Sequence, residues 1–235
     1  MKIDAAKHWK ASRDDYQDRL LGLIESYPRP DVLELGGGRR PSFALSDMPD
    51  NMESYTVNDI SENELALLPP GYHKACFDVS GDASAFAGRY DVVFSRFLAE
   101  HVGDGPALHR NVWQVLKPGG VAFHLIPTLY ASPFVVNRLL PEVATGKMLT
   151  KFFPSRKSKL PKFPAFYSMC YGDTERMRKA FVDIGYSKVE IREFYGHFYY
   201  DAIPGLRQLE GFVSALAAKN GWSWYASYAF ITAYK

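Results

Sequence analysis

Three consecutive glycines follow a short apolar segment near the start of the chain. Residues 32–35 read Val-Leu-Glu-Leu, which is typical of a buried strand, and Gly36, Gly37 and Gly38 come directly after it. Glycine tolerates positive φ and lets the backbone approach a ligand closely. Such a turn should open a helix, but Pro41 stands where a dinucleotide fingerprint has its last glycine, so a nicotinamide cofactor is disfavoured.

Three acidic side chains lie at the ends of three consecutive expected strands. Glu34 precedes the glycines, Asp59 follows the strand expected over 53–58, and Asp78 follows the one over 74–77. Ligands of open α/β sheets bind at the carboxyl edge, where these side chains should meet. Asp59 suits two ribose hydroxyls, Asp78 an adenine amino group, and Glu34 an ammonium group or a water network. Together the acids predict a site for an adenosine that bears an ammonium group.

The elements that must position these side chains alternate along the chain. Strands are expected over residues 32–35, 53–58, 74–77, 90–95, 121–126, 187–194 and 224–234, with a turn at 117–120. Helices are expected over residues 13–26, 61–68, 104–116, 173–184 and 204–219. Strands that alternate with helices at this spacing predict βαβ units, a parallel sheet and the α/β class.

Taken in order, these pieces resemble the class I S-adenosylmethionine-dependent methyltransferases. The matching pieces are residues 32–38, Asp59, Asp78, Tyr-Asp-Val-Val-Phe-Ser at 90–95 with Ala-Glu-His-Val at 99–102, and Val-Leu-Lys-Pro-Gly-Gly at 115–120. The resemblance implies a doubly wound, mostly parallel seven-stranded sheet with helices on both faces. It also implies an antiparallel last strand that lies between strands five and six.

S-adenosylmethionine is the cofactor that this resemblance implies. The residues expected to bind it are Glu34, Gly36, Gly37, Gly38, Asp59, Ile60, Asp78, Val79, Ser95 and Arg96. Within this set, Glu34 and the glycines line the methionine part, Asp59 holds the ribose, Asp78 and the Val79 amide hold the adenine, and Ser95 and Arg96 form the rim near the sulfonium. The alternative is structural, because acids at strand-to-helix junctions often cap the next helix. Arg40 departs from the family pattern, which has a small residue there.

Catalysis by methyl transfer to oxygen needs positioning and a base for the hydroxyl proton. The candidate bases are His101, which follows the fourth strand, and His197, which lies in an aromatic segment over 195–200. His124 falls inside the fifth strand and is expected to be a satisfied core residue. No histidine–carboxylate spacing predicts a metal site. The remaining histidines, expected on the surface, are His8, His73 and His109.

Residues 129–170 break the alternation and are rich in aromatic, basic and proline residues. We expect this insertion and the segment 195–200 to form a substrate pocket and lid, and a homodimer interface is the alternative use of such a surface. The charge run at 156–159 is either a solvated face or an anion subsite. Residues 127–142 are also loosely similar to bacterial methyltransferases associated with cell-surface saccharide clusters.

Composition bounds the function. The chain has 235 residues, a net charge of +2 and two cysteines, which favours one cytoplasmic domain over 1–235 without a disulfide framework or a transmembrane segment. Residues 95–98 lack the Asn- or Asp-Pro-Pro-aromatic tetrad of base methyltransferases, so no nucleic-acid partner is expected. The sequence predicts methyl transfer to a small molecule or saccharide, at a hydroxyl oxygen. A protein substrate and a non-catalytic binding or interaction module of the same fold stay open.

Overall fold

The computed structural model describes residues 2–132, 134–135, 164–201 and 203–235. A seven-stranded sheet in the order β3-β2-β1-β4-β5-β7-β6 forms its centre. The strands are β1 (Asp31–Leu35), β2 (Ser54–Asp59), β3 (His73–Cys76), β4 (Tyr90–Arg96), β5 (Leu116–Pro127), β6 (Lys188–Phe194) and β7 (Tyr228–Tyr234). Strand β7 runs antiparallel to both β5 and β6, while the pairs among β1 to β5 are parallel. The predicted topology is confirmed, including the position of the last strand.

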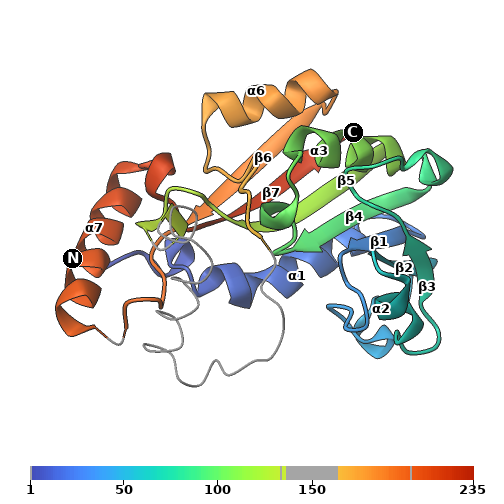
Figure 1. Ribbon diagram of the computed structural model, residues 1–235, viewed down its shortest axis with the longest axis horizontal. Helices are drawn as coiled ribbons and strands as arrows, with labels where there is room; N and C mark the ends of the chain where they lie inside the picture. Colours follow the sequence, from blue (N-terminus) through green and yellow to red (C-terminus); the bar gives the residue numbers. More distant parts are fainter. Residues whose placement is uncertain (1, 133, 136–163, 202) are drawn as a thin grey trace.

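Helices lie on both faces of this sheet. They are α1 (Ala11–Glu25), α2 (Glu62–Ala66), α3 (Gly105–Val115), α6 (Glu175–Ile184) and α7 (Pro204–Asn220). In Figure 1, α3 and α6 cover one face while α1 lies against the other. Side-chain oxygens of Ser61, Asp104 and Thr174 cap α2, α3 and α6 by accepting a backbone N–H from the first turn.

The core follows from this double cover. Because a parallel sheet is buried on both faces, its central strands are mostly apolar between their ends. Residues 121–126 of β5 are all fully buried, and Val32, Leu33 and Leu35 of β1 are at most 3% exposed. The side chains at the carboxyl ends of these rigid strands are therefore held in fixed positions.

One predicted helix is absent and one predicted strand begins later than expected, each for a local reason. The helix expected after the glycines is absent, and the connection 36–53 holds only a short 3₁₀ helix, Leu45–Asp47. Pro41 disfavours helical geometry at the residue before it. The last strand begins at Tyr228 rather than at residue 224, because Ser223–Tyr225 forms a 3₁₀ turn.

The turn expected at 117–120 lies inside β5, where the pairing with β4 is irregular. Tyr90 pairs with Leu116, whereas Val92 already pairs with Val121. Gly119 takes a φ of 79° within this excursion, a conformation that favours glycine.

His109 is fully buried, so its expected surface position is wrong. It projects from α3, and its ring centroid lies 4.5 Å from that of Phe181 on α6 and 5.3 Å from that of His124 on β5. Because α6 packs over α3, the buried face of α3 includes His109 as well as the apolar residues Leu108 and Val112.

Most of the expected insertion, residues 133 and 136–163, lies outside the described residues, and so does the charge run at 156–159. The single-domain layout and the lid stay predictions. No helix in the described part of the chain is long and apolar enough to cross a membrane.

Candidate active site

The glycine loop packs against the ends of two neighbouring strands. Gly36 and Gly38 have φ values of 72° and 52°, which other residues rarely adopt. A Cβ added to Gly38 would lie 2.9 Å from Oδ2 of Asp59 on β2, and one added to Gly36 would lie 2.8 Å from the Leu98 side chain after β4. The sheet therefore brings the glycines, Asp59 and the segment after β4 together, as predicted for strand ends that share one edge.

The side chain of Glu34 holds this loop in place through hydrogen bonds. Its carboxylate is only 3% exposed and accepts hydrogen bonds from the Ser42 backbone N–H at 3.0 Å, the Ser42 hydroxyl at 2.5 Å and the Tyr55 hydroxyl. Burial raises the pKa of Glu34, and these hydrogen bonds oppose the rise. Sequence reasoning missed Ser42 and Tyr55, because neither belongs to a recognisable spacing.

The end of β2 presents a polar and an apolar side chain next to each other. Asp59 is partly exposed, and its Oδ1 accepts the Ser61 backbone N–H at 2.9 Å. Ile60 follows and is 71% exposed, which is high for an isoleucine. Arg39 lies beside them and forms two hydrogen bonds with Glu64 of α2, at 2.5 and 2.6 Å.

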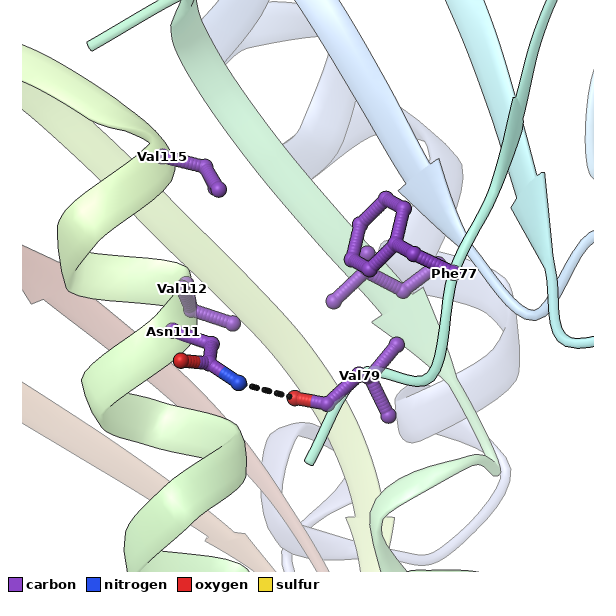
Figure 2. A pocket seen from close by; sticks show the side chains of 6 residues that line it. Phe77, Val79, Asn111, Val112 and Val115 are labelled. Atoms are coloured by element: carbon purple, nitrogen blue, oxygen red, sulfur yellow. Dashed lines mark hydrogen bonds between the residues drawn. The ribbon is translucent and has the colours of Figure 1, made fainter. Parts of the chain in front are cut away.

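The loop after β3 carries Asp78 and Val79. Asp78 is exposed and its Oδ1 accepts the Ser80 backbone N–H at 2.8 Å, so this acid supports its own turn. Asn111 of α3 holds the loop by donating from Nδ2 to the carbonyls of Val79, at 3.0 Å, and Gly81, at 2.6 Å. Figure 2 shows the first of these bonds beside the apolar side chains of Phe77, Val112 and Val115. Asn111 is a further positioning residue that the sequence did not reveal.

Ser95 and Arg96 at the end of β4 point in different directions. The Ser95 side chain is fully buried, and its hydroxyl lies 2.8 Å from Nδ1 of His124 on β5. Arg96 is exposed, with its guanidinium carbon 5.5 Å from the ring centroid of Tyr16. His124 is buried in the core as predicted, but the expectation that it is fully satisfied is wrong, because its Nε2 has no hydrogen-bond partner in the described structure. Only Arg96 of this pair presents its side chain to the surface.

The two candidate bases have unlike surroundings. His101 is exposed, and its Nδ1 lies 2.8 Å from the carbonyl oxygen of Pro164. The His197 side chain is buried, with Nε2 3.3 Å from Oε1 of Glu210 on α7. Glu210 also accepts a hydrogen bond from Tyr225 at 2.8 Å. Burial would raise the pKa of Glu210, but the hydrogen bonds from His197 and Tyr225 outweigh it and lower that pKa to about 2.

Glu100 was also missed in the sequence, although it lies in the same Ala-Glu-His-Val segment as His101. It is 6% exposed, and Oε2 is buried without a hydrogen-bond partner in the described structure. Buried acids are rare without a partner, so Glu100 is a candidate functional residue as much as its neighbour His101.

The donor set fits a nucleoside ligand at this edge. Two accessible carboxylates, Asp59 and Asp78, are acceptors for hydroxyl and amino groups, and the exposed Ile60 offers an apolar surface for a base. In the described part of the chain, no cluster of three His, Cys, Asp or Glu side chains could hold a metal ion.

Comparisons with known proteins agree with this arrangement. A family described as "Methyltransferase domain" matches residues 8–190. The fold and the site define a class I S-adenosylmethionine-dependent methyltransferase. Because the match covers more than half of the chain, the chain belongs to this methyltransferase-domain family.

Individual relatives are distant. A SAM-dependent methyltransferase from Archaeoglobus fulgidus superposes with a TM-score of 0.56 at 15% identity, covering 95% of this chain and 94% of that one. The CMeT domain of a citrinin polyketide synthase gives 0.51 at 13% identity, covering 87% of this chain and 45% of that chain. The hybrid PKS-NRPS synthetase mpsA of Macrophomina phaseolina (strain MS6) is 29% identical over 131 residues, half of this chain but 3% of the relative's length.

Proposed function

We propose that this chain transfers a methyl group from S-adenosylmethionine to a hydroxyl oxygen of a small molecule or saccharide. One observation carries the proposal. The position of a Cβ on Gly38 falls 2.9 Å from Asp59 Oδ2, so the glycine loop and the carboxylate form one continuous surface at the sheet edge. Ligands of open α/β sheets bind at this edge.

The residues present fit the cofactor, and each is proposed to hold a different part of it. Asp59 binds the ribose hydroxyls, Ile60 packs on the adenine, and Asp78 with the Val79 amide binds the edge of the adenine. The backbone of Gly36 to Gly38 lies along the methionine part, and Arg96 forms the rim. When bound, S-adenosylmethionine supplies a methyl group on a sulfonium, whose carbon–sulfur bond breaks as the acceptor oxygen bonds to the methyl carbon.

Aromatic side chains near the ends of β5 and β4 favour a ring-bearing acceptor. Tyr130 and Tyr171 stack with centroids 5.7 Å apart, and Tyr130 is 49% exposed. Relatives whose names refer to polyketide synthesis support a natural product as the acceptor. Residues 129–170 and 195–200 are proposed to form this pocket and to close over it.

His101 and His197 stay proposals as bases. The pairing of His197 with Glu210 suits a positioning role as well as proton transfer, because its Nε2 is already engaged. A cytoplasmic setting, suggested by two unpaired cysteines, and a homodimer also stay proposals.

Two assays test the function. Isothermal calorimetry should show binding of S-adenosylhomocysteine to the purified chain. Radiolabelled methyl transfer from S-adenosylmethionine is then measured on a panel of phenols, polyketide lactones, sugars and amines. We expect label on hydroxyl-bearing members. Absence of S-adenosylhomocysteine binding contradicts the proposal, and binding without transfer favours the non-catalytic module.

Deletion of residues 150–162 separates the lid from the dimer interface. Lost turnover with intact S-adenosylhomocysteine binding and unchanged mass in light scattering supports the lid. A lower mass with turnover retained supports the interface instead.

A further inference from the structure

Glu100 combines burial with an unpartnered oxygen at the carboxyl end of β4. It lies in the 3₁₀ turn Ala99–His101, and its Oε2 accepts no hydrogen bond in the described part of the chain. An isolated carboxylate in an apolar setting is costly unless it is paired or protonated. In an enzyme such a group is a candidate for proton transfer.

The backbone around Glu100 is strained. Among the described residues, the non-glycine residues with positive φ are Phe97, Tyr167 and Met169, at 54–55°. Phe97 lies on the same connection as Glu100, and the carbonyl of Glu100 accepts the backbone N–H of Phe166 at 2.7 Å and of Tyr167 at 3.1 Å. Strained residues cluster at active sites and ligand clamps, so their position beside one buried acid points to function.

Aromatic rings line the same region. The Tyr228 ring lies 6.0 Å from Phe97 and 5.7 Å from Phe134, and Phe134 lies 5.6 Å from Tyr199 and 6.0 Å from Tyr167. Phe97 and Tyr199 are only partly buried, so part of this wall is accessible. A ring-bearing acceptor fits against such a wall.

The titratable groups that face Glu100 come from three segments. His101 is its neighbour, with Nε2 3.9 Å from Oε1, while Cys170 and Tyr167 belong to the segment after the insertion and Tyr228 belongs to β7. Burial, and then the charge of Glu100, raises the pKa of the Cys170 thiol. Burial above all, with a contribution from Glu100, raises the pKa of the Tyr228 hydroxyl. Both groups are therefore neutral at pH 7.

We propose that Glu100 Oε2 is the atom that accepts the proton of the acceptor hydroxyl during methyl transfer. The proposal rests on the function proposed above and deepens it by naming Glu100 as the base in place of His101 and His197. The hydroxyl oxygen forms its bond to the methyl carbon, the sulfur keeps the electron pair of the broken bond, and the proton passes to Glu100. The product leaves as a methyl ether, and the proton then returns to solvent.

The acidity of Glu100 suits this role. Burial raises the pKa of Glu100 to about 8, close to the pH at which a base works best. Below that pH the carboxyl is protonated in the empty enzyme. The turnover rate should therefore increase as pH rises through about 8.

The test compares Glu100→Gln, which keeps the shape but cannot take a proton, with Glu100→Asp and with the surface control Glu190→Gln. S-adenosylhomocysteine affinity should stay within about two-fold in all three variants, because Glu100 acts on the acceptor. Failure of the wild type to bind S-adenosylhomocysteine would overturn the proposed function itself and, with it, this role. Turnover with a methylated panel member should fall about 10²- to 10⁴-fold in Glu100→Gln. The rise in rate with pH should also disappear.

A second readout needs no acceptor. Difference infrared spectra of the S-adenosylhomocysteine complex should show a protonated carboxyl band that titrates near pH 8 and is missing in Glu100→Gln. Glu100→Asp should keep part of the activity and a raised titration. A band that titrates in the ordinary carboxyl range, or a Glu100→Gln variant with turnover within two-fold of wild type and the same pH profile, would overturn the proposal.

Discussion

The two halves of the sheet edge differ in how their polar groups are satisfied. On the side of β1, β2 and β3, Glu34 accepts hydrogen bonds from Ser42 and Tyr55, and Asp59 accepts one from its own turn. On the side of β4, β5 and β7, Glu100 Oε2 and His124 Nε2 are buried without a partner in the described structure. The first half is complete before any ligand binds.

This difference indicates which part of the sheet edge can vary in its ligand specificity. A loop whose hydrogen bonds are internal holds one geometry and suits a ligand common to a whole family. A region with unpartnered groups and strained residues is stabilised only when a ligand or a proton completes it. The cofactor half should therefore respond to steric changes, and the acceptor half to changes of charge and pH.

Among the changes that add steric bulk, Gly38→Ala should give the largest effect. Its Cβ would meet Asp59 Oδ2 at 2.9 Å, and φ is already 52°. We expect S-adenosylhomocysteine affinity in calorimetry to fall by more than about 2 kcal/mol, roughly thirty-fold. Gly88→Ala is the matched control, because Gly88 has a φ of 62° and no described atom lies within 4 Å of the added Cβ. Similar losses of affinity in both variants would show that the loss does not come from the contact between residue 38 and Asp59.

Acid should remove the stabilisation that the buried histidines contribute, whereas protonation of Glu100 acts in the opposite direction. Burial lowers the pKa of His109 and lowers that of His124 to about 4, so both are neutral when folded. The unfolded chain binds their protons below its pKa of about 6.5, so their stabilisation is present above that pH and is lost as pH falls toward about 4. At pH 5 the loss is about 2 kcal/mol for His124.

Urea unfolding of wild type and His124→Gln between pH 8 and pH 5 measures this loss as a difference between the two proteins, because the contribution of Glu100 is common to both. Relative to wild type, His124→Gln should lose about 2 kcal/mol less on going to pH 5, and His73→Gln, at an exposed position, should follow wild type. A slope that is identical in all three proteins would show that the buried histidines do not set the acid limit.

Tyr55→Phe tests the claim that the cofactor half is internally satisfied. The change removes the hydroxyl that donates to the buried carboxylate of Glu34. We expect a loss of about 1–2 kcal/mol in the free energy of unfolding, because a buried carboxyl group is left short of a partner. Tyr72→Phe removes a hydrogen bond to the neutral carbonyl of Phe43 and should lose less. An equal loss in the two variants would argue against a special role for Glu34.

Asn111→Ala should give the smallest effect. It frees the carbonyls of Val79 and Gly81 and loosens the loop that carries Asp78. S-adenosylhomocysteine affinity should weaken by about 1 kcal/mol, roughly five-fold. Asn220→Ala, which removes an exposed bond within α7, should leave affinity unchanged. No change in Asn111→Ala would separate this loop from cofactor binding.

The sequence predicted the features that follow from alternation and strand order. The strands and most helix boundaries are confirmed, because apolar runs, caps such as Thr174 and stops such as Gly185 act locally. The convergence of Gly38 and Asp59 was predictable as well, since strand ends of a parallel sheet share an edge.

Other features depend on tertiary contacts that leave no local pattern. Asn111 reaches a loop 30 residues earlier in the chain, and the burial of His109 depends on α6. Glu100 was visible in the sequence, but its importance comes from burial and strain that only the folded chain reveals. The alternation of polar and apolar residues cannot encode such contacts.

Titration of S-adenosylhomocysteine into wild type, Asp59→Ala and Asp82→Ala tests whether Asp59 and the carboxyl edge of the sheet bind the cofactor. Asp82 is an exposed acid that likewise accepts a backbone N–H two residues on, at 2.8 Å, so it matches Asp59 in local structure. We expect wild type and Asp82→Ala to bind S-adenosylhomocysteine. For Asp59→Ala we expect the binding free energy to fall by about 1.5–3 kcal/mol for each hydrogen bond removed. An affinity in Asp59→Ala equal to that of wild type, or a wild-type chain that does not bind, would contradict this prediction.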